Sequence, residues 1–143
     1  MEPETADDAF KSWKTKRLHK LTEPTATIAD GVRVSSLGRL NFEVIVERGL
    51  VDEIVTVTEA EIEEALVVAW TSLKLAIEPT AALPLAAYLA GKLPDLGPSG
   101  LLALIFSGGN FDPAQIAPYL SAPRRSRLST QPKSKHRAAQ LHA

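Results

Sequence analysis

The chain has 143 residues, a formal net charge of −1 at pH 7 and no cysteine. This length fits one domain or part of a larger one, and the composition is that of a soluble globular protein. The lack of cysteine excludes disulfides, thiolate metal ligands and a cysteine nucleophile in this sequence. No run is apolar enough for a secretory signal or for a membrane span of about 20 residues, so we expect a cytoplasmic protein without a membrane partner.

Acidic and basic residues are separated along the chain. No acidic residue follows Asp112, whereas six Arg and Lys residues lie between 124 and 137. The segment from 121 onward has little apolar surface to bury, which predicts disorder. We therefore divide the chain into a folded part, residues 1–120, and a basic tail, residues 121–143. Such a tail can bind nucleic acid in a strongly salt-dependent way, but a solvated terminus is the favoured interpretation.

The acidic N-terminus leads into a predicted helix over residues 6–19. Carboxylates at Glu2, Asp7 and Asp8 would suit a hard cation such as magnesium or calcium, which prefers oxygen ligands. Acidic residues are equally favoured at a helix N-terminus, because they interact well with the helix dipole. From these residues alone, the helix-cap interpretation is favoured.

The middle of the chain alternates irregular and short regular segments. Residues 21–40 are predicted to be irregular, although Thr27 to Gly31 is apolar enough to be covered. A short helix is expected over 42–48, where it would be ended by Gly49, and a β-branched strand over 54–57.

Two helices follow that strand. Thr58 and Glu61 form a capping box, which predicts a helix from Thr58 to about Lys74. Pro79 then opens a second, almost wholly apolar helix that ends at Ala90 and should be buried on most sides.

Leu101 to Phe106 is a continuous apolar run that stops at a Ser-Gly-Gly-Asn turn. Such a run is typical of a parallel strand buried on both faces. Ligands of open α/β sheets bind beyond the carboxyl ends of the strands, so Ser107 could meet a bound molecule there. The alternative is an ordinary exit from a strand into a turn.

Five segments carry motifs in one order along the chain. They are EPETADD from Glu2 to Asp8, TIADGV from Thr27 to Val32, LVDEIV from Leu50 to Val55, KLAIEPTA from Lys74 to Ala81, and SGGN from Ser107 to Asn110. With these motifs, residues 2 to about 113 resemble the C-terminal part of fold-type II pyridoxal-phosphate enzymes of the threonine/serine dehydratase and serine racemase group. The resemblance implies an α/β fold: a partial large domain of parallel strands and packed helices that lacks its N-terminal half.

The resemblance also implies roles for individual residues around pyridoxal 5'-phosphate. Ser107 would face the pyridine nitrogen, Gly31 would lie against the cofactor face, Glu78 would stand near the ring, and Gly108 would belong to the same cofactor site. A neutral hydroxyl cannot hold a proton on a weakly basic pyridine as a carboxylate would. The ring would then be a milder electron sink, which suits loss of a β-hydroxyl better than transamination.

Further ligands follow from the same resemblance. Glu2, the backbone carbonyl of Ala6 and Asp8 match the divalent-metal site of the family, so the metal interpretation with Mg²⁺ or Ca²⁺ replaces the helix-cap one. In the serine racemase branch, Lys74 and Asn110 match residues that contact ATP, and Asn41 lies near a further ion site.

The lysine that this family needs in Schiff-base linkage, and its glycine-rich phosphate loop, have no counterpart in this sequence. We therefore expect no catalytic residue in this chain, no activity of the chain alone, and exposed apolar surface on 101–106 and on the 79–90 helix.

The implied function is that of a fragment of an ammonia-lyase or racemase. The complete enzyme would be a homodimer that removes water from serine, threonine or 3-hydroxyaspartate to give a 2-oxo acid and ammonia, or racemises its substrate. The alternative is a truncated, non-catalytic paralogue that acts as an interaction or vestigial protein.

Overall fold

A computed structural model describes residues 1–23 and 25–121. Its elements are β1 (Glu2–Pro3), α1 (Asp8–Thr15), η1 (Asp30–Val32), α2 (Arg39–Phe42), η2 (Glu43–Glu47), β2 (Thr56–Val57), α3 (Glu59–Val68), η3 (Ala69–Leu73), η4 (Thr80–Ala82), α4 (Leu83–Leu89) and α5 (Pro113–Ser121). The predicted basic tail lies, from residue 122 onward, outside this range. Within the described ranges, every helix is too short or too polar to cross a bilayer.

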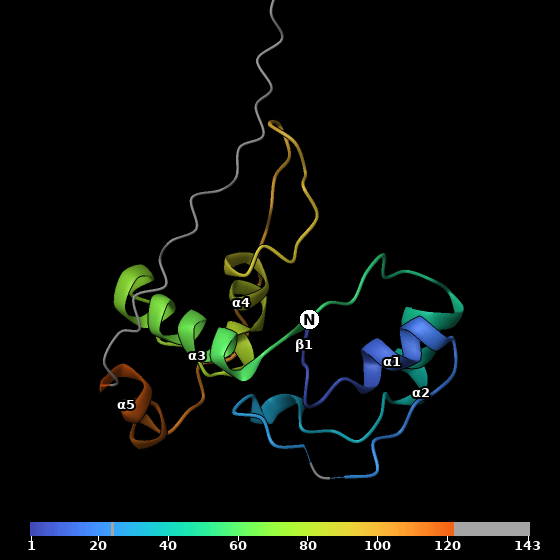
Figure 1. The fold of residues 1–143 in the computed structure, drawn as a ribbon, viewed down its shortest axis with the longest axis horizontal. Helices are drawn as coiled ribbons and strands as arrows, with labels where there is room; N and C mark the ends of the chain where they lie inside the picture. Colours follow the sequence, from blue (N-terminus) through green and yellow to red (C-terminus); the bar gives the residue numbers. More distant parts are fainter. Residues whose placement is uncertain (24, 122–143) are drawn as a thin grey trace, which may run out of the picture.

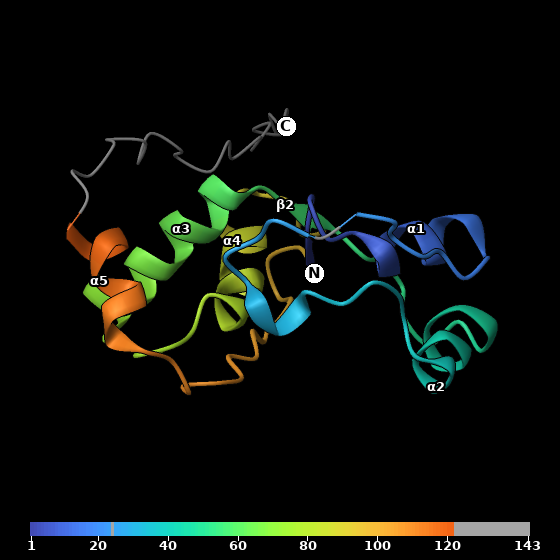
Figure 2. The ribbon, with the colours of Figure 1, turned by 90° about the horizontal axis from the view of Figure 1, so that it is seen from below.

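The helices form two groups joined by a small parallel sheet. Helices α3, α4 and α5 gather on one side of β1, and α1 and α2 lie on the other (Figure 1). The view from below keeps the same two groups and shows β2 beside the N-terminus (Figure 2). β1 pairs with β2 in parallel, with Glu2 opposite Thr56 and Pro3 opposite Val57. The predicted fold class, a piece of a parallel α/β sheet with packed helices, is confirmed.

Helix α1 is shorter than the predicted 6–19 segment. It ends at Thr15 because Lys16 adopts a left-handed conformation with φ 57°. Buried Ser12 stabilises the end of the helix: its hydroxyl donates to the carbonyl of Asp8 (2.7 Å) and accepts from the amide of His19 (2.9 Å). The predicted helix over 42–48 also differs, since α2 and the π-helical turn η2 together span 39–47.

The capping box at Thr58 is present. The Thr58 hydroxyl accepts from the Glu61 amide (3.2 Å), and the Glu61 carboxylate accepts from the Thr58 amide (2.7 Å). Ile62 and Leu66 are fully buried. The helical segment runs through η3 to Leu73, close to its predicted end.

The helix predicted over 79–90 is present as η4 and α4, which span 80–89, and its predicted burial on most sides is confirmed. Leu83, Leu85 and the two alanines after them are buried, because α4 packs against α3 and β2. The expectation that the 79–90 helix would expose apolar surface is therefore wrong, with Tyr88 as an exposed exception at 53%.

Residues 101–106 differ from the predicted strand. They form no strand pairing, and Leu101 and Ile105 are 95% and 78% exposed. A strand is defined by hydrogen bonds to a neighbour, and no described segment lies in position to provide them. The expected exposed apolar surface on this segment is confirmed.

Lys92 connects three elements that are distant in the sequence. Its ammonium donates to the Thr56 carbonyl of β2 (3.0 Å) and to the Glu61 carboxylate of α3 (2.7 Å), and it lies 3.9 Å from Glu4, just after β1. Burial alone would raise the pKa of Glu61, but the hydrogen bonds from Lys92 and Thr58 outweigh it and hold the pKa below its ordinary value.

We predict that Lys92→Met destabilises the chain by about 1 kcal/mol, because it removes a half-buried ion pair and leaves the Thr56 carbonyl without this donor. Since the folded-state pKa of Glu61 is lowered, its contribution is complete above the ordinary glutamate pKa and is lost as the pH falls below it. Urea unfolding should show a smaller loss of stability on acidification in Lys92→Met. Lys20→Met, at an exposed position, is the control, and equal stability of the two variants would contradict the prediction.

Candidate functional site

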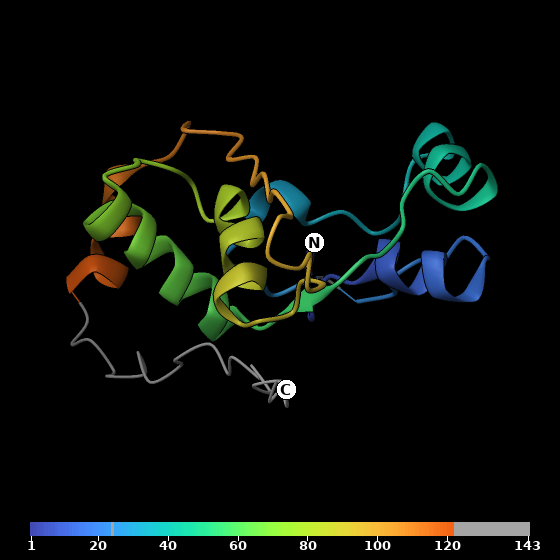
Figure 3. The ribbon, with the colours of Figure 1, turned by 90° about the horizontal axis from the view of Figure 1, so that it is seen from above.

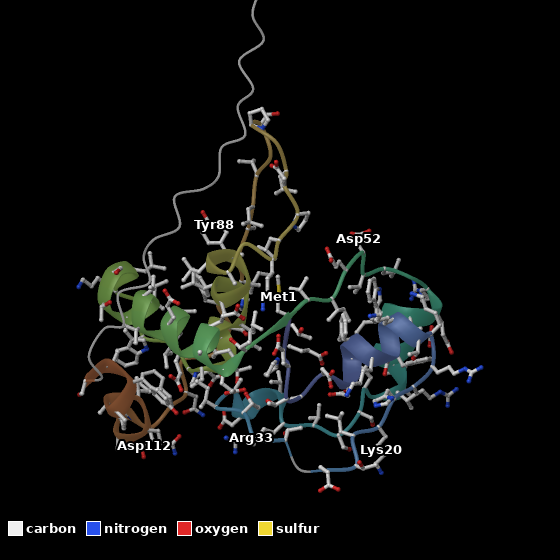
Figure 4. The ribbon with its side chains drawn as sticks, viewed as in Figure 1. Met1, Lys20, Arg33, Asp52, Tyr88 and Asp112 are labelled. Atoms are coloured by element: carbon white, nitrogen blue, oxygen red, sulfur yellow. The ribbon has the colours of Figure 1, made fainter. Side chains whose placement is uncertain are left out.

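An open cleft of about 770 Å³ lies between the 28–33 segment, the start of η4 and α5. The lining residues are Ile28, Asp30, Arg33, Glu78, Pro79, Asn110, Phe111, Asp112, Gln115, Ile116 and Tyr119. Arg33 and Asp112 lie along the same edge of the molecule in Figure 4. The Arg33 guanidinium donates to the Thr27 carbonyl (2.8 Å). This bond holds the Arg33 cation beside the carboxylates that also line the cleft.

The turn after Phe106 lies directly against Glu78. Gly108 has φ +85°, and a Cβ added there would lie 2.7 Å from Cδ of Glu78. The Glu78 amide also donates to the Gly108 carbonyl (3.4 Å). The positive φ favours glycine here, and a side chain at this position would also require the Glu78 carboxylate to shift. The neighbouring Ser107 is exposed, but Ser107, Gly108 and Gly31 are not among the residues that line the cleft.

Gly31 makes a second contact between motifs that are distant in the sequence. Its amide donates to the Thr80 hydroxyl (2.9 Å), and a Cβ on Gly31 would come equally close to that oxygen. Thr80 was not singled out from the sequence. The available signal was its place two residues after Glu78 in one motif, but its partner is 49 residues away.

An aromatic pair joins the segment before Glu78 to the segment after Asn110. Trp70 and Phe111 pack edge to face with ring centroids 5.0 Å apart, and the Trp70 indole donates to the Ile77 carbonyl (2.9 Å). Ile116 of α5 is buried in the same core, on the side of α3. The residues immediately before Glu78 and after Asn110 are thus held by one tryptophan.

The predicted metal ligands lie at the start of α1. The Glu2 carboxylate accepts from the amides of Ala9 (3.2 Å) and Phe10 (2.7 Å), as a helix cap does. Asp8 is only 1% exposed, and neither of its carboxylate oxygens has a hydrogen-bond partner. A buried carboxylate without a partner is costly, so this position fits a cation.

Burial raises the pKa of both carboxyl groups. For Glu2, the two amide hydrogen bonds oppose the rise in pKa and the nearby charge of Asp8 adds to it. For Asp8, its own backbone amide and the charge of His19 oppose the rise in pKa, and the charge of Asp7 adds to it. In the described part of the chain, no three His, Cys, Asp or Glu side chains form a metal-binding group. A metal here would therefore need a backbone oxygen such as that of Ala6, which the family resemblance implies as a ligand.

Lys74 and Asn110, which were predicted to contact a nucleotide, do not lie in one site. Asn110 lines the cleft, but Lys74 does not, and its ammonium donates to the Thr71 carbonyl (2.7 Å). Asn41 is exposed in α2. The proposed nucleotide and second ion contacts stay predictions.

The chain belongs to the pyridoxal-phosphate dependent enzyme family, whose sequence model matches residues 1–108. Its relatives include serine racemase of Rattus norvegicus, 42% identical over 112 residues, and beta-hydroxyaspartate dehydratase of Paracoccus denitrificans, 37% identical over 111 residues. Each alignment covers 78% of this chain and 33% of the relative. The solved structure of T.th. threonine deaminase matches with TM-score 0.69 and 47% identity, over 78% of this chain and 36% of that one.

The chain thus spans about a third of the length of these relatives. The family uses pyridoxal phosphate as its cofactor. The resemblance to this family is confirmed, whereas the role of each residue stays a prediction.

We predict that Gly108→Ala lowers thermal stability more than Gly91→Ala. Both glycines have positive φ, +85° and +65°, but only at Gly108 would the new methyl meet another residue, Glu78. Strain alone accounts for about 1 kcal/mol at either glycine, and at Gly108 the displacement of the Glu78 carboxylate should add to that loss. Equal melting temperatures for the two variants would show that the turn does not lie against Glu78.

Proposed function

We propose that this chain supplies the C-terminal third of a pyridoxal-phosphate dependent dehydratase or racemase that acts on hydroxy amino acids such as serine, threonine or 3-hydroxyaspartate. The observation that carries the proposal is the Gly108 turn packed against Glu78, beside an exposed Ser107, in a member of this family. The names of the relatives, a serine racemase and a beta-hydroxyaspartate dehydratase among them, support the substrate class.

When bound, the cofactor supplies an electron sink for the charge left after removal of the substrate α-proton. Ser107 would offer a neutral hydroxyl to the ring nitrogen, so the nitrogen would not be held protonated. This favours loss of a β-hydroxyl or racemisation over transamination. Gly31 would present a flat surface to the cofactor, since its backbone is bound to Thr80 and a side chain there would displace that threonine.

The lysines of the described residues do not suit covalent attachment of the cofactor. Lys74 and Lys92 are bonded to backbone and carboxylate oxygens, four others lie between 11 and 20, and none lines the cleft. The attachment lysine and the phosphate loop would come from the part of the family fold that this chain does not span. We therefore propose a fragment that is inactive alone and contributes residues 1–120 to a cytoplasmic, homodimeric enzyme.

A divalent cation, Mg²⁺ or Ca²⁺, would be held by Asp8, Glu2 and the Ala6 carbonyl. The support for this site is the buried and unpartnered carboxylate of Asp8. The ion would supply charge compensation at the start of α1 and would hold β1 against that helix, so its role would be structural.

The catalytic proposal can be tested by co-expressing the chain with the part of T.th. threonine deaminase that precedes the matched region, here called the complementing polypeptide. The assembly should show the visible absorption of lysine-bound pyridoxal phosphate and release 2-oxo acid from serine or threonine. Ser107→Ala should lower turnover about tenfold, the effect of one lost hydrogen bond, while Ser99→Ala should not. Absence of cofactor absorption in a well-formed assembly would overturn the proposal.

Absence of cofactor absorption would support the alternative function, that of a non-catalytic paralogue. The observation that favours it is the lack of a suitable lysine at the cleft among the described residues. An interaction protein would bind its partner without cofactor, and its binding would not respond to Ser107→Ala.

For the metal site, we predict that Asp8→Asn raises the stability of the chain without Mg²⁺ and removes the stabilisation that Mg²⁺ gives. Without metal, removing a buried unpaired charge should raise stability by about 1–3 kcal/mol. With metal, the wild-type melting temperature should rise and that of Asp8→Asn should stay unchanged. Asp52→Asn, an exposed carboxylate, is the control. Equal responses of Asp8→Asn and wild type to Mg²⁺ would exclude the site.

A further inference from the structure

The backbone of residues 28–31 is held by two side chains from distant parts of the chain. The Ile28 amide donates to the Glu59 carboxylate in the first turn of α3 (2.9 Å), and the Gly31 amide donates to the hydroxyl of Thr80, the first residue of η4 (2.9 Å). Figure 3 shows the turn η1, which contains Gly31, beside the helix formed by η4 and α4. The segment is thus anchored at both of its ends.

Thr80 belongs to the same short turn as Glu78. The Ala81 amide donates to the Glu78 carbonyl (3.1 Å), and Ala81 itself is buried, so this turn is fixed in the core. One end of the turn contacts Gly108 through Glu78, and the other end contacts Gly31 through Thr80. The two glycines are therefore held in place by one turn.

Glu59 is placed by the start of helix α3. It directly follows the N-cap residue Thr58, and its second carboxylate oxygen accepts from the Thr5 hydroxyl (3.2 Å). The two oxygens of one carboxylate thus bind two separate segments, which restricts the side chain to one orientation. The negative charge is also favoured at this end of the helix by the helix dipole.

We propose that Glu59 and Thr80 are positioning residues that hold residues 28–31 in the conformation that lies against pyridoxal phosphate. The inference rests on the proposed function, in which Gly31 lies against the cofactor face. An amide in the first turn of a helix, such as that of Gly31 in η1, has no partner within that helix, so loss of the Thr80 hydroxyl would free it. A segment that must be ordered when a ligand binds costs affinity, whereas an ordered one does not.

The first test measures amide hydrogen exchange in the chain itself. Thr80→Val removes the hydroxyl at nearly constant shape and should speed exchange of the Gly31 amide about fivefold, whereas Thr80→Ser should keep the wild-type rate. Glu59→Met should do the same to the Ile28 amide. Glu59→Gln keeps an acceptor oxygen and should leave that amide as it is in the wild type.

The second test measures the dissociation constant of pyridoxal phosphate in the assembly with the complementing polypeptide, followed by visible absorption. Thr80→Val and Glu59→Met should each raise it about tenfold, because the freed segment must be ordered on binding. Thr80→Ser and Glu59→Gln should bind as the wild type does. The controls are Thr15→Val, which also removes a hydroxyl bonded to a carbonyl (2.7 Å), and Glu63→Met, at an exposed glutamate of α3. Both controls should leave the dissociation constant unchanged.

Unchanged exchange at Gly31 in Thr80→Val, or at Ile28 in Glu59→Met, would overturn the inference. A merely structural role would lower the melting temperature of these variants and leave the dissociation constant unchanged, which would also overturn it. The proposed function fails in a different way: a wild-type assembly without cofactor absorption rejects that function, and the inference with it. An assembly that binds the cofactor equally well with and without the Thr80 hydroxyl and the Glu59 carboxylate rejects the inference alone.

Discussion

The close approach of Gly108 to Glu78 is the contact on which the rest of the site depends. A left-handed turn lets the backbone lie where any side chain would collide with the carboxylate. Glu78 in turn follows Ile77, whose carbonyl is held by Trp70, and Trp70 packs on Phe111 beyond the turn. The turn and the carboxylate are therefore held by the same aromatic residue, and Ser107 stays exposed next to them.

The local sequence predicted the elements that depend on near neighbours. The capping box at Thr58 and the burial of Ile62 and Leu66 follow from residues within one helix. Contacts between distant segments could not be predicted in this way. The bonds of Lys92 to Thr56 and Glu61, and of Gly31 to Thr80, join residues 31 to 49 positions apart.

The prediction of a strand over 101–106 is wrong for a physical reason. Its apolar pattern is that of a strand covered on both faces, but only Leu104 and Phe106 pack against the core, and Leu101, Leu102 and Ile105 are exposed. The pattern could not show whether a neighbouring strand is present to form hydrogen bonds with this segment. The family motifs were sufficient to place the chain among pyridoxal-phosphate enzymes, of which it spans about a third.

The most direct measurement is a crystal structure of the chain assembled with the complementing polypeptide and pyridoxal phosphate. We predict that the ring nitrogen faces the Ser107 hydroxyl, with Glu78 still against Gly108 and Gly31 still bound to Thr80. A ring that contacts neither Ser107 nor the Gly108 turn, or a Glu78 side chain turned away from that glycine, would contradict it.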